Sequence, residues 1–279
     1  MKLRLFLVIS ALVAIVYAVA DPFLSGSPST LPIWSVIVAV GAFIPAIIAF
    51  IAQKDSLKTF ASDYLSLRKT DWRKAAIVLG ATAILSPLLR LVIVGVFGNL
   101  LHVSFFGEFS HQFHVNYLGV ISWYGSGVAD TLMACAGDMV YLFVIGSIVG
   151  IFSCLFEEIA WRGFLIKYLK GSDLTMSVIS GVVWTLWTLA MTYVVTTWSN
   201  ALMLLIFNVV LSYWLVRIMR ATGSVWTCAM IRGMFSLGAM SFCVVQESHV
   251  GSYMVSIIIA LILTAVLWGV IRPRAWYGE

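Results

Sequence analysis

Long apolar runs, separated by loops whose charge alternates, limit the fold of this chain more than any other feature. Hydrophobic residues make up 62% of the 279 residues and charged residues only 10%, too few to give a soluble globule a polar surface. A helix needs about 20 predominantly apolar residues to span a bilayer. Eight runs meet this description: 5–20, 33–53, 75–98, 128–156, 174–197, 201–216, 224–245 and 252–271. The sequence therefore predicts an all-α integral membrane protein with about eight transmembrane helices in one bundle.

Basic residues occupy every second loop. The loops 21–32, 99–127, 196–200 and 246–251 contain no Lys or Arg. The bases stand in the other loops and at the termini: Lys2, Arg4, Lys54, Lys58, Arg68, Lys69, Arg73, Lys74, Arg162, Lys167, Lys170, Arg217, Arg220, Arg272 and Arg274. By the positive-inside rule this pattern predicts that both termini are cytoplasmic. It also accounts for the excess of 17 basic over 12 acidic residues, so we expect a lipid bilayer and no nucleic acid as partner.

Two adjacent acids, Glu157 and Glu158, follow an apolar run that begins at Asp138, and Arg162 and Gly163 come next on the same predicted helix. Two like charges at a membrane boundary repel each other and lose hydration, which is unfavourable. Acids kept in such a place indicate a functional site, and the charge pattern predicts that it lies on the cytoplasmic side.

The sequence around these acids resembles a known family. Residues 156–164 match the EExxxRG signature of the CPBP (Abi) family, the membrane-embedded type II CAAX prenyl endopeptidases and bacteriocin-processing proteins. Residues 177–189 resemble the second motif of that family, FxxxH or WxLWH, and residues 223–236 resemble the third, GSxW followed by HxxxN. The resemblance implies a CPBP-like transmembrane bundle at 33–279, with a motif core at about 150–240, after a first span and outer loop at 1–32.

The resemblance also implies a chemistry. In the family, the first glutamate and the second-motif histidine activate a water, and the third-motif histidine and asparagine stabilise the oxyanion; we expect neither a cofactor nor a metal. The candidate catalytic residues here are Glu157, Glu158 and Arg162. The chain departs from the family at three positions, because Thr188 and Arg232 replace the two histidines and Ser236 replaces the asparagine.

These substitutions leave two functions open, so the sequence does not decide whether the chain is an enzyme. In the first, Arg232 and Arg162 neutralise the acids, and a catalytically impaired relative holds a membrane-tethered peptide or membrane protein. In the second, an active intramembrane peptidase uses Glu157, with Glu158, to activate water, while Arg232 and Ser236 donate to the oxyanion. A third class, secondary transport, rests on the intramembrane charges of Arg90, Asp130 and Asp138.

Further residues carry weaker expectations. Arg90 lies inside an apolar run, so we expect Asp130 or Asp138 to pair with it, as a structural ion pair or as part of a relay. The histidines of loop 99–127 (His102, His111 and His114) are interpreted as solvated rather than metal-binding, and the cysteine spacing suggests neither a disulfide framework nor a zinc site.

Two membrane features complete the predictions. The basic loop 54–74 is expected to form a short amphipathic helix on the membrane surface. The first apolar run ends in Ala18, Val19 and Ala20, which also fits a cleaved signal peptide, so its retention stays open. We expect a multi-pass protein of a prokaryotic cell membrane.

Overall fold

The computed structural model describes most of the chain. The described residues are 2–25, 29–101, 103–105, 112–117, 121–126, 128–191, 197–238, 244–246 and 249–272. Side chains are not described at some of these positions, including those between 101 and 132.

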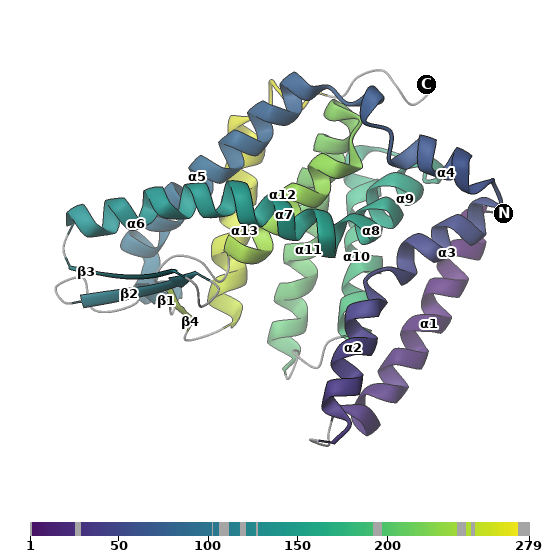
Figure 1. Cartoon of the computed structure of the whole chain (residues 1–279), viewed down its shortest axis with the longest axis horizontal. Helices are drawn as coiled ribbons and strands as arrows, with labels where there is room; N and C mark the ends of the chain where they lie inside the picture. Colours follow the sequence, from purple (N-terminus) through teal and green to yellow (C-terminus); the bar gives the residue numbers. More distant parts are fainter. Residues whose placement is uncertain are drawn as a thin grey trace.

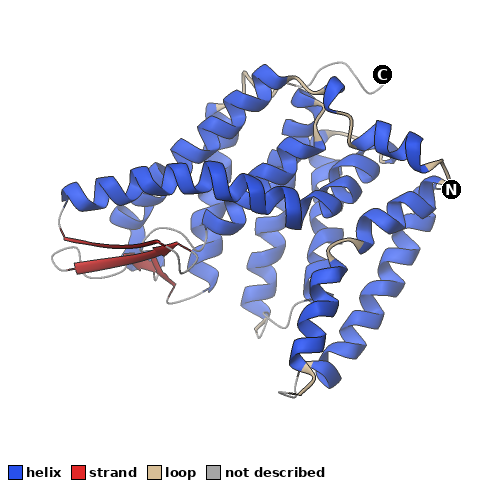
Figure 2. Cartoon of the chain, in the orientation of Figure 1, coloured by secondary structure: helices blue, strands red, loops and turns tan. Residues whose placement is uncertain are grey.

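Helices dominate the described residues (Figures 1 and 2). The α-helices are α1 (Lys2–Leu24), α2 (Leu31–Gly41), α3 (Ile44–Gln53), α4 (Leu57–Tyr64), α5 (Trp72–Leu101), α6 (Val128–Tyr141), α7 (Ser147–Val149), α8 (Leu155–Glu158), α9 (Leu165–Tyr168), α10 (Asp173–Met191), α11 (Trp198–Thr222), α12 (Val225–Gly238) and α13 (His249–Val266). A 3-10 turn, η1 (Leu67–Lys69), and three π-helical segments, η2 (Leu142–Gly146), η3 (Gly150–Cys154) and η4 (Ile159–Phe164), complete the helical elements.

Each of the eight predicted apolar runs contains helix, but they differ in length. Among the described residues, five helices are long and apolar enough to cross a membrane: Lys2–Leu24, Trp72–Phe97, Cys135–Tyr168, Asp173–Ala190 and Trp198–Thr222. Helices α2 and α3 make a sixth candidate if they form one span bent by 41°. The bend lies between Gly41 and Pro45, and a proline near a helix start cannot continue the preceding hydrogen-bond ladder. Because α12 and α13 are shorter, the count of eight spans and the orientation remain predictions.

The loop 99–127 contains strands, which the sequence analysis did not predict. Strands β2 (Gln112–Tyr117) and β3 (Ile121–Ser126) form an antiparallel hairpin, and β1 (Val103–Phe105) pairs with β4 (Val244–Gln246). Aromatic and β-branched residues, which favour strands, are frequent here. His102 and His111 lie outside the described residues, and His114 stands on β2 at a position whose side chain is not described.

The elements from α6 to α9 form one long helix with π-helical turns. In Figure 1 it runs across the view, whereas α10, α11 and α13 run from top to bottom. Its part from Cys135 to Tyr168 has 34 residues, and η3 and η4 flank the short α8 that carries the two acids. Such wide turns often occur at functional sites, because each inserts a residue and changes the direction of the side chains that follow.

Glycines bring α12 against this long helix. A Cβ added to Gly233 would lie 2.1 Å from the carbonyl oxygen of Gly146, and one added to Gly150 would lie 2.2 Å from that of Ala229. The two backbones therefore touch, as in membrane helix pairs that use small residues four positions apart. This crossing places Arg232, the neighbour of Gly233, beside the acid-bearing part of the long helix.

Candidate functional site

Four charged side chains form the acid-pair cluster, which consists of Glu157, Glu158, Arg162 and Arg232. The first three lie on α8 and η4 of the long helix, and Arg232 comes from α12. The two elements are far apart in sequence, and the glycine crossing brings them together. The predicted contact between Arg232 and both acids is present in the structure.

The inner half of the cluster is completely buried. Arg162 Nη1 donates to Glu158 Oε1 at 3.0 Å, one helical turn away, and both side chains are 0% exposed. Arg162 Nη2 donates to Ser212 Oγ of α11 at 2.9 Å. Glu158 Oε2 and Arg162 Nε have no hydrogen-bond partner among the described residues. Buried charges of this kind are tolerated only when they are paired.

The outer half of the cluster is formed by Arg232, whose guanidinium binds both acids. Its Nη2 donates to Glu157 Oε2 at 2.6 Å and its Nη1 to Glu158 Oε1 at 3.2 Å. Trp161 Nε1 also donates to Glu157 Oε2, at 3.5 Å. The side chains of Arg232 and Glu157 are 12% and 13% exposed, so this half has limited access. The two terminal nitrogens of Arg232, called the guanidinium fork below, thus hold one oxygen of each carboxylate.

Trp184 of α10 supports both guanidiniums. The Cζ atoms of Arg162 and Arg232 lie 4.7 Å and 4.3 Å from the centroid of its ring. Cations over an indole face are attracted by its quadrupole. With two carboxylates, two guanidiniums and one indole, the cluster is close to neutral and well supported.

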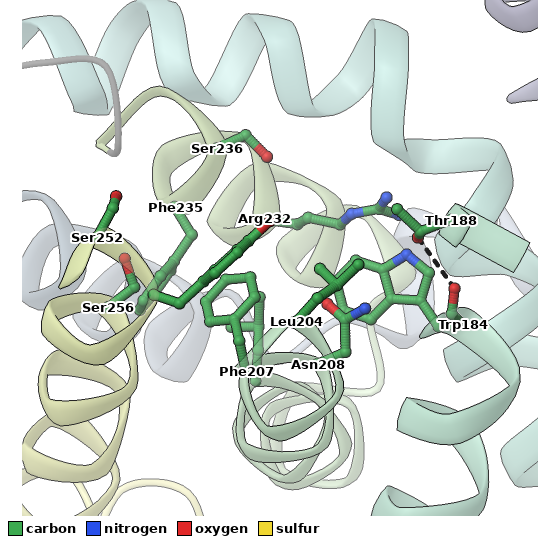
Figure 3. A pocket seen from close by; sticks show the side chains of 12 residues that line it. Trp184, Thr188, Leu204, Phe207, Asn208, Arg232, Phe235, Ser236, Ser252 and Ser256 are labelled. Atoms are coloured by element: carbon green, nitrogen blue, oxygen red, sulfur yellow. Dashed lines mark hydrogen bonds between the residues drawn. The ribbon is translucent and has the colours of Figure 1, made fainter. Parts of the chain in front are cut away.

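A cavity of about 230 Å³ lies next to Arg232, and residues of α10, α11, α12 and α13 line it (Figure 3). Its lining residues are Trp184, Thr188, Leu204, Phe207, Asn208, Leu211, Arg232, Phe235, Ser236, Ser252, Tyr253 and Ser256. Figure 3 shows the guanidinium of Arg232 reaching toward Thr188 and Trp184, while Ser252 and Ser256 line the opposite wall. Neither acid is among the described residues that line this cavity.

The structure thus separates the sequence-predicted site residues into two groups. Glu157, Glu158, Arg162 and Arg232 form the acid-pair cluster. Thr188 and Ser236 line the cavity, where the Thr188 hydroxyl donates to the Trp184 carbonyl oxygen at 2.9 Å. Arg232 is the residue that belongs to both groups.

The sequence analysis missed several supporting residues. Ser212 accepts from Arg162, and Asn208, which lines the cavity, donates to Thr185 Oγ1 at 3.1 Å. Neither residue carries a recognisable motif. The Gly146 and Gly150 pair does have a sequence signal, because glycines four apart in an apolar run are typical of close helix contacts.

The remaining predictions have mixed outcomes. Arg90 and Asp138 are both buried, and their ion pair stays a prediction. The side chain of Asp130 lies outside the described residues. Within the described part of the chain there is no group of His, Cys, Asp and Glu that could hold a metal, and Cys135, Cys154 and Cys228 are free.

Comparison with protein families gives a match to part of the chain. Residues 138–238 match the family model described as type II CAAX prenyl endopeptidase Rce1-like. This segment of the chain is Rce1-like. It contains the whole acid-pair cluster together with Thr188 and Ser236, so the resemblance inferred from the three motifs is confirmed. No curated protein matches the chain. The several apolar helices support a multi-pass membrane protein, and its segment 138–238 is similar to CAAX-type intramembrane endopeptidases.

Proposed function

We propose that this chain is a catalytically impaired relative of the glutamate-dependent CAAX-type endopeptidases that holds a membrane-bound peptide or protein partner. One observation carries this proposal: Arg232, at the motif position of a histidine, binds both Glu157 and Glu158. A general base must have a lone pair directed at the proton that it removes. Here the guanidinium donors occupy the carboxylate oxygens that face α12.

The substituted motif positions supply no replacement for the base. The hydroxyl of Thr188 does not take up a proton at neutral pH, and a guanidinium is already protonated. Loss of an imidazole base typically lowers a rate by a factor of about 100 to 10,000. A retained fold with a blocked base fits binding better than hydrolysis.

The cavity supports the binding part of the proposal. It keeps about 230 Å³ of space beside the substituted motif residues, although the acids do not line it. Its wall combines aromatic and aliphatic side chains with the polar groups of Thr188, Asn208 and Ser236. Mostly apolar pockets with a few polar groups are typical ligand sites. We infer that a membrane-tethered peptide or a partner helix places a side chain there.

A cleavage assay separates binding from hydrolysis. The purified full chain in detergent is incubated with prenylated and transmembrane peptides, beside its Glu157→Gln variant. We expect no cleavage above that of the variant. Cleavage by the unmodified chain that Glu157→Gln abolishes would overturn the proposal in favour of a working peptidase.

A second experiment restores the family residues. The triple variant Thr188→His, Arg232→His and Ser236→Asn removes the guanidinium fork and supplies two imidazoles and an amide. We expect it to gain cleavage, and the same variant with Glu157→Gln to lose it. Cooperative thermal unfolding of both variants shows that they are folded.

Binding is tested with a substitution that fills the cavity. Leu204 is buried and lines the cavity, whereas Leu202 on the same helix is exposed and does not line it. We expect Leu204→Trp to weaken binding of a fluorescent prenylated peptide and Leu202→Trp to leave it unchanged. Equal binding by both variants would place the partner elsewhere.

A further inference from the structure

The segment between α3 and α5, residues 54–74, presents a row of cations outside the Rce1-like segment. Five of its basic side chains are exposed: Lys54, Lys58, Arg68, Lys69 and Arg73. The side chain of Lys74 is partly exposed. They are distributed over the C-cap of α3, helix α4, the turn η1 and the start of α5. The outer face of this segment is therefore strongly positive.

The acids of the same segment are engaged by other groups. Asp63 accepts from Lys167 Nζ at 2.7 Å and from Gln53 Nε2 at 3.2 Å. Asp55 accepts from Gln53 at 2.7 Å, and Asp71 Oδ1 accepts from the backbone N–H of Lys74 at 3.2 Å. The acids are thus paired at partly exposed positions, whereas the five exposed bases point away from the protein.

The inner face of α4 is fixed against the acid-bearing helix. Phe60 and Tyr64 are buried, and a Cβ added to Gly163 would lie 2.7 Å from Tyr64 Cδ1. Trp226 Nε1 of α12 donates to the carbonyl oxygen of Leu65 at 3.2 Å. Figure 1 shows α4 at the end of the molecule that also holds the N-terminus and α9. Packing therefore holds the segment in one orientation, with its basic face outward.

Apolar side chains accompany the exposed bases. Leu57 is 70% exposed, Leu67 47% and Trp72 52%. The segment follows the candidate bent span α2–α3 and leads into the candidate span that begins at Trp72, so it connects two candidate membrane spans. Tryptophan and leucine beside Lys and Arg are typical of helices that lie in the membrane interface.

We propose that residues 54–74 bind the anionic headgroups of the adjacent leaflet. Basic residues that only set the orientation of a membrane protein need no fixed surface. Here packing fixes the backbone, the acids are bound to other groups, and Leu57, Leu67 and Trp72 are exposed beside the bases. Each Lys or Arg near an anionic surface increases association by about fivefold.

Hydrogen exchange in nanodiscs tests this proposal. The full chain is placed in phosphatidylcholine nanodiscs or in nanodiscs with equimolar phosphatidylglycerol, and exchange of the peptides that cover 54–74 is followed by mass spectrometry. We expect several-fold slower exchange with phosphatidylglycerol and loss of the difference at high salt, because salt screens charges. Free inorganic phosphate added to the phosphatidylcholine sample should give no protection, because the proposed partner is a lipid.

Two matched variants make the test specific. Lys58→Gln with Lys69→Gln removes two cations from the segment and should reduce the protection. Arg4→Gln with Lys170→Gln removes two exposed cations elsewhere and should leave it unchanged. Equal exchange in the two lipids, or protection by phosphate alone, would overturn the proposal. The readout involves neither cleavage nor a bound peptide, so it is independent of the proposed function.

Discussion

Among the residues that the structure describes, the acid-pair cluster and a second cluster both combine arginine, carboxylate and tryptophan, but they have different physical explanations. The Asp173 cluster consists of Asp173, Arg217 and Arg220: Arg217 Nη1 donates to Asp173 Oδ2 at 2.9 Å, and Arg220 donates to Asp173 Oδ1. The Cζ of Arg217 lies 4.2 Å from the ring centroid of Trp268. The same chemical groups thus occur twice.

Helix-end electrostatics account for the Asp173 cluster. Asp173 lies in the first turn of α10, and Arg220 lies in the last turn of α11. An acid at a helix N-terminus and a base at a C-terminus are each favoured by the helix dipole. In contrast, the acids and Arg162 lie inside the long helix, and Arg232 lies inside α12. Helix-end electrostatics therefore does not explain the acid-pair cluster. Its charged residues instead lie in the segment that is similar to Rce1-like endopeptidases.

Removal of Arg232 should have the largest effect. Arg232→Leu leaves Glu157 without its partner and Glu158 with Arg162 alone, so we expect a loss of about 3–5 kcal/mol in unfolding free energy. Arg220→Leu removes one of the two charged hydrogen bonds of Asp173, which stays paired with Arg217, so we expect a smaller loss there, of about 1–2 kcal/mol. Thermal unfolding in detergent measures both.

Arg232→Lys is the control for this experiment, because it keeps the charge and loses the fork. Its unfolding free energy should lie between that of the unmodified chain and that of Arg232→Leu. If Arg232→Leu and Arg220→Leu destabilise equally, the two clusters do not differ in the way proposed.

The contact between Arg232 and the acids was predictable from the sequence. A guanidinium inside an apolar run needs a partner. Arg232 also stands eight residues, or about 12 Å along a helix, from the start of the run 224–245, a depth similar to that predicted for Glu157 and Glu158. The helical nature of the eight apolar runs followed from composition alone, because a bilayer leaves few other structures for such runs.

The support of the cluster was less predictable. Trp184 lies within the segment that resembles the second motif, but its contact with two guanidiniums depends on how α10 is rotated. Ser212 lies 50 residues from Arg162, and no pattern joins them. The hairpin of β2 and β3 was not predicted, because residues 99–127 were interpreted as an irregular loop between two transmembrane helices. Side-chain direction and strand pairing are tertiary properties, so a periodic pattern does not reveal them.

Gly233→Ala should break the helix crossing that forms the acid-pair cluster. The new methyl group would lie 2.1 Å from Gly146 O and 2.4 Å from Gly150 N, so the helices must separate. We expect a loss of about 1–3 kcal/mol, as in other overpacked interiors. Gly80→Ala on α5 is the control, because nothing lies within 4 Å of its added Cβ. Similar thermal midpoints for the two variants would show that the crossing is looser than described.

The tryptophans should differ by a smaller amount. Trp184 supports two guanidiniums and is buried, whereas Trp268 supports one and is exposed. Cation–π contacts contribute about 0.5–2 kcal/mol, more when they are desolvated. We expect Trp184→Phe to lower the unfolding free energy by about 1 kcal/mol and Trp268→Phe to change it less. A larger effect of Trp268→Phe in thermal unfolding would reverse the comparison.

The ion pair of Asp63 and Lys167 should contribute least to the unfolding free energy, because it lies at the surface. Partial burial raises the pKa of Asp63, but the hydrogen bond and charge of Lys167, together with the Gln53 hydrogen bond and the Lys69 charge, hold this pKa below its ordinary value. A carboxyl with a lowered folded-state pKa adds stability above its unfolded-state pKa and loses that stability as pH falls through the folded-state value. Asp63→Asn should therefore cost about 0.2–1 kcal/mol at neutral pH and almost nothing in strong acid. Unfolding measured from neutral to acidic pH tests this, and Lys167→Gln should reduce the pH-dependent part without removing all of it, because Gln53 and Lys69 also lower the pKa of Asp63. A gap between Asp63→Asn and the unmodified chain that stays constant with pH would mean that the pair contributes through packing rather than charge.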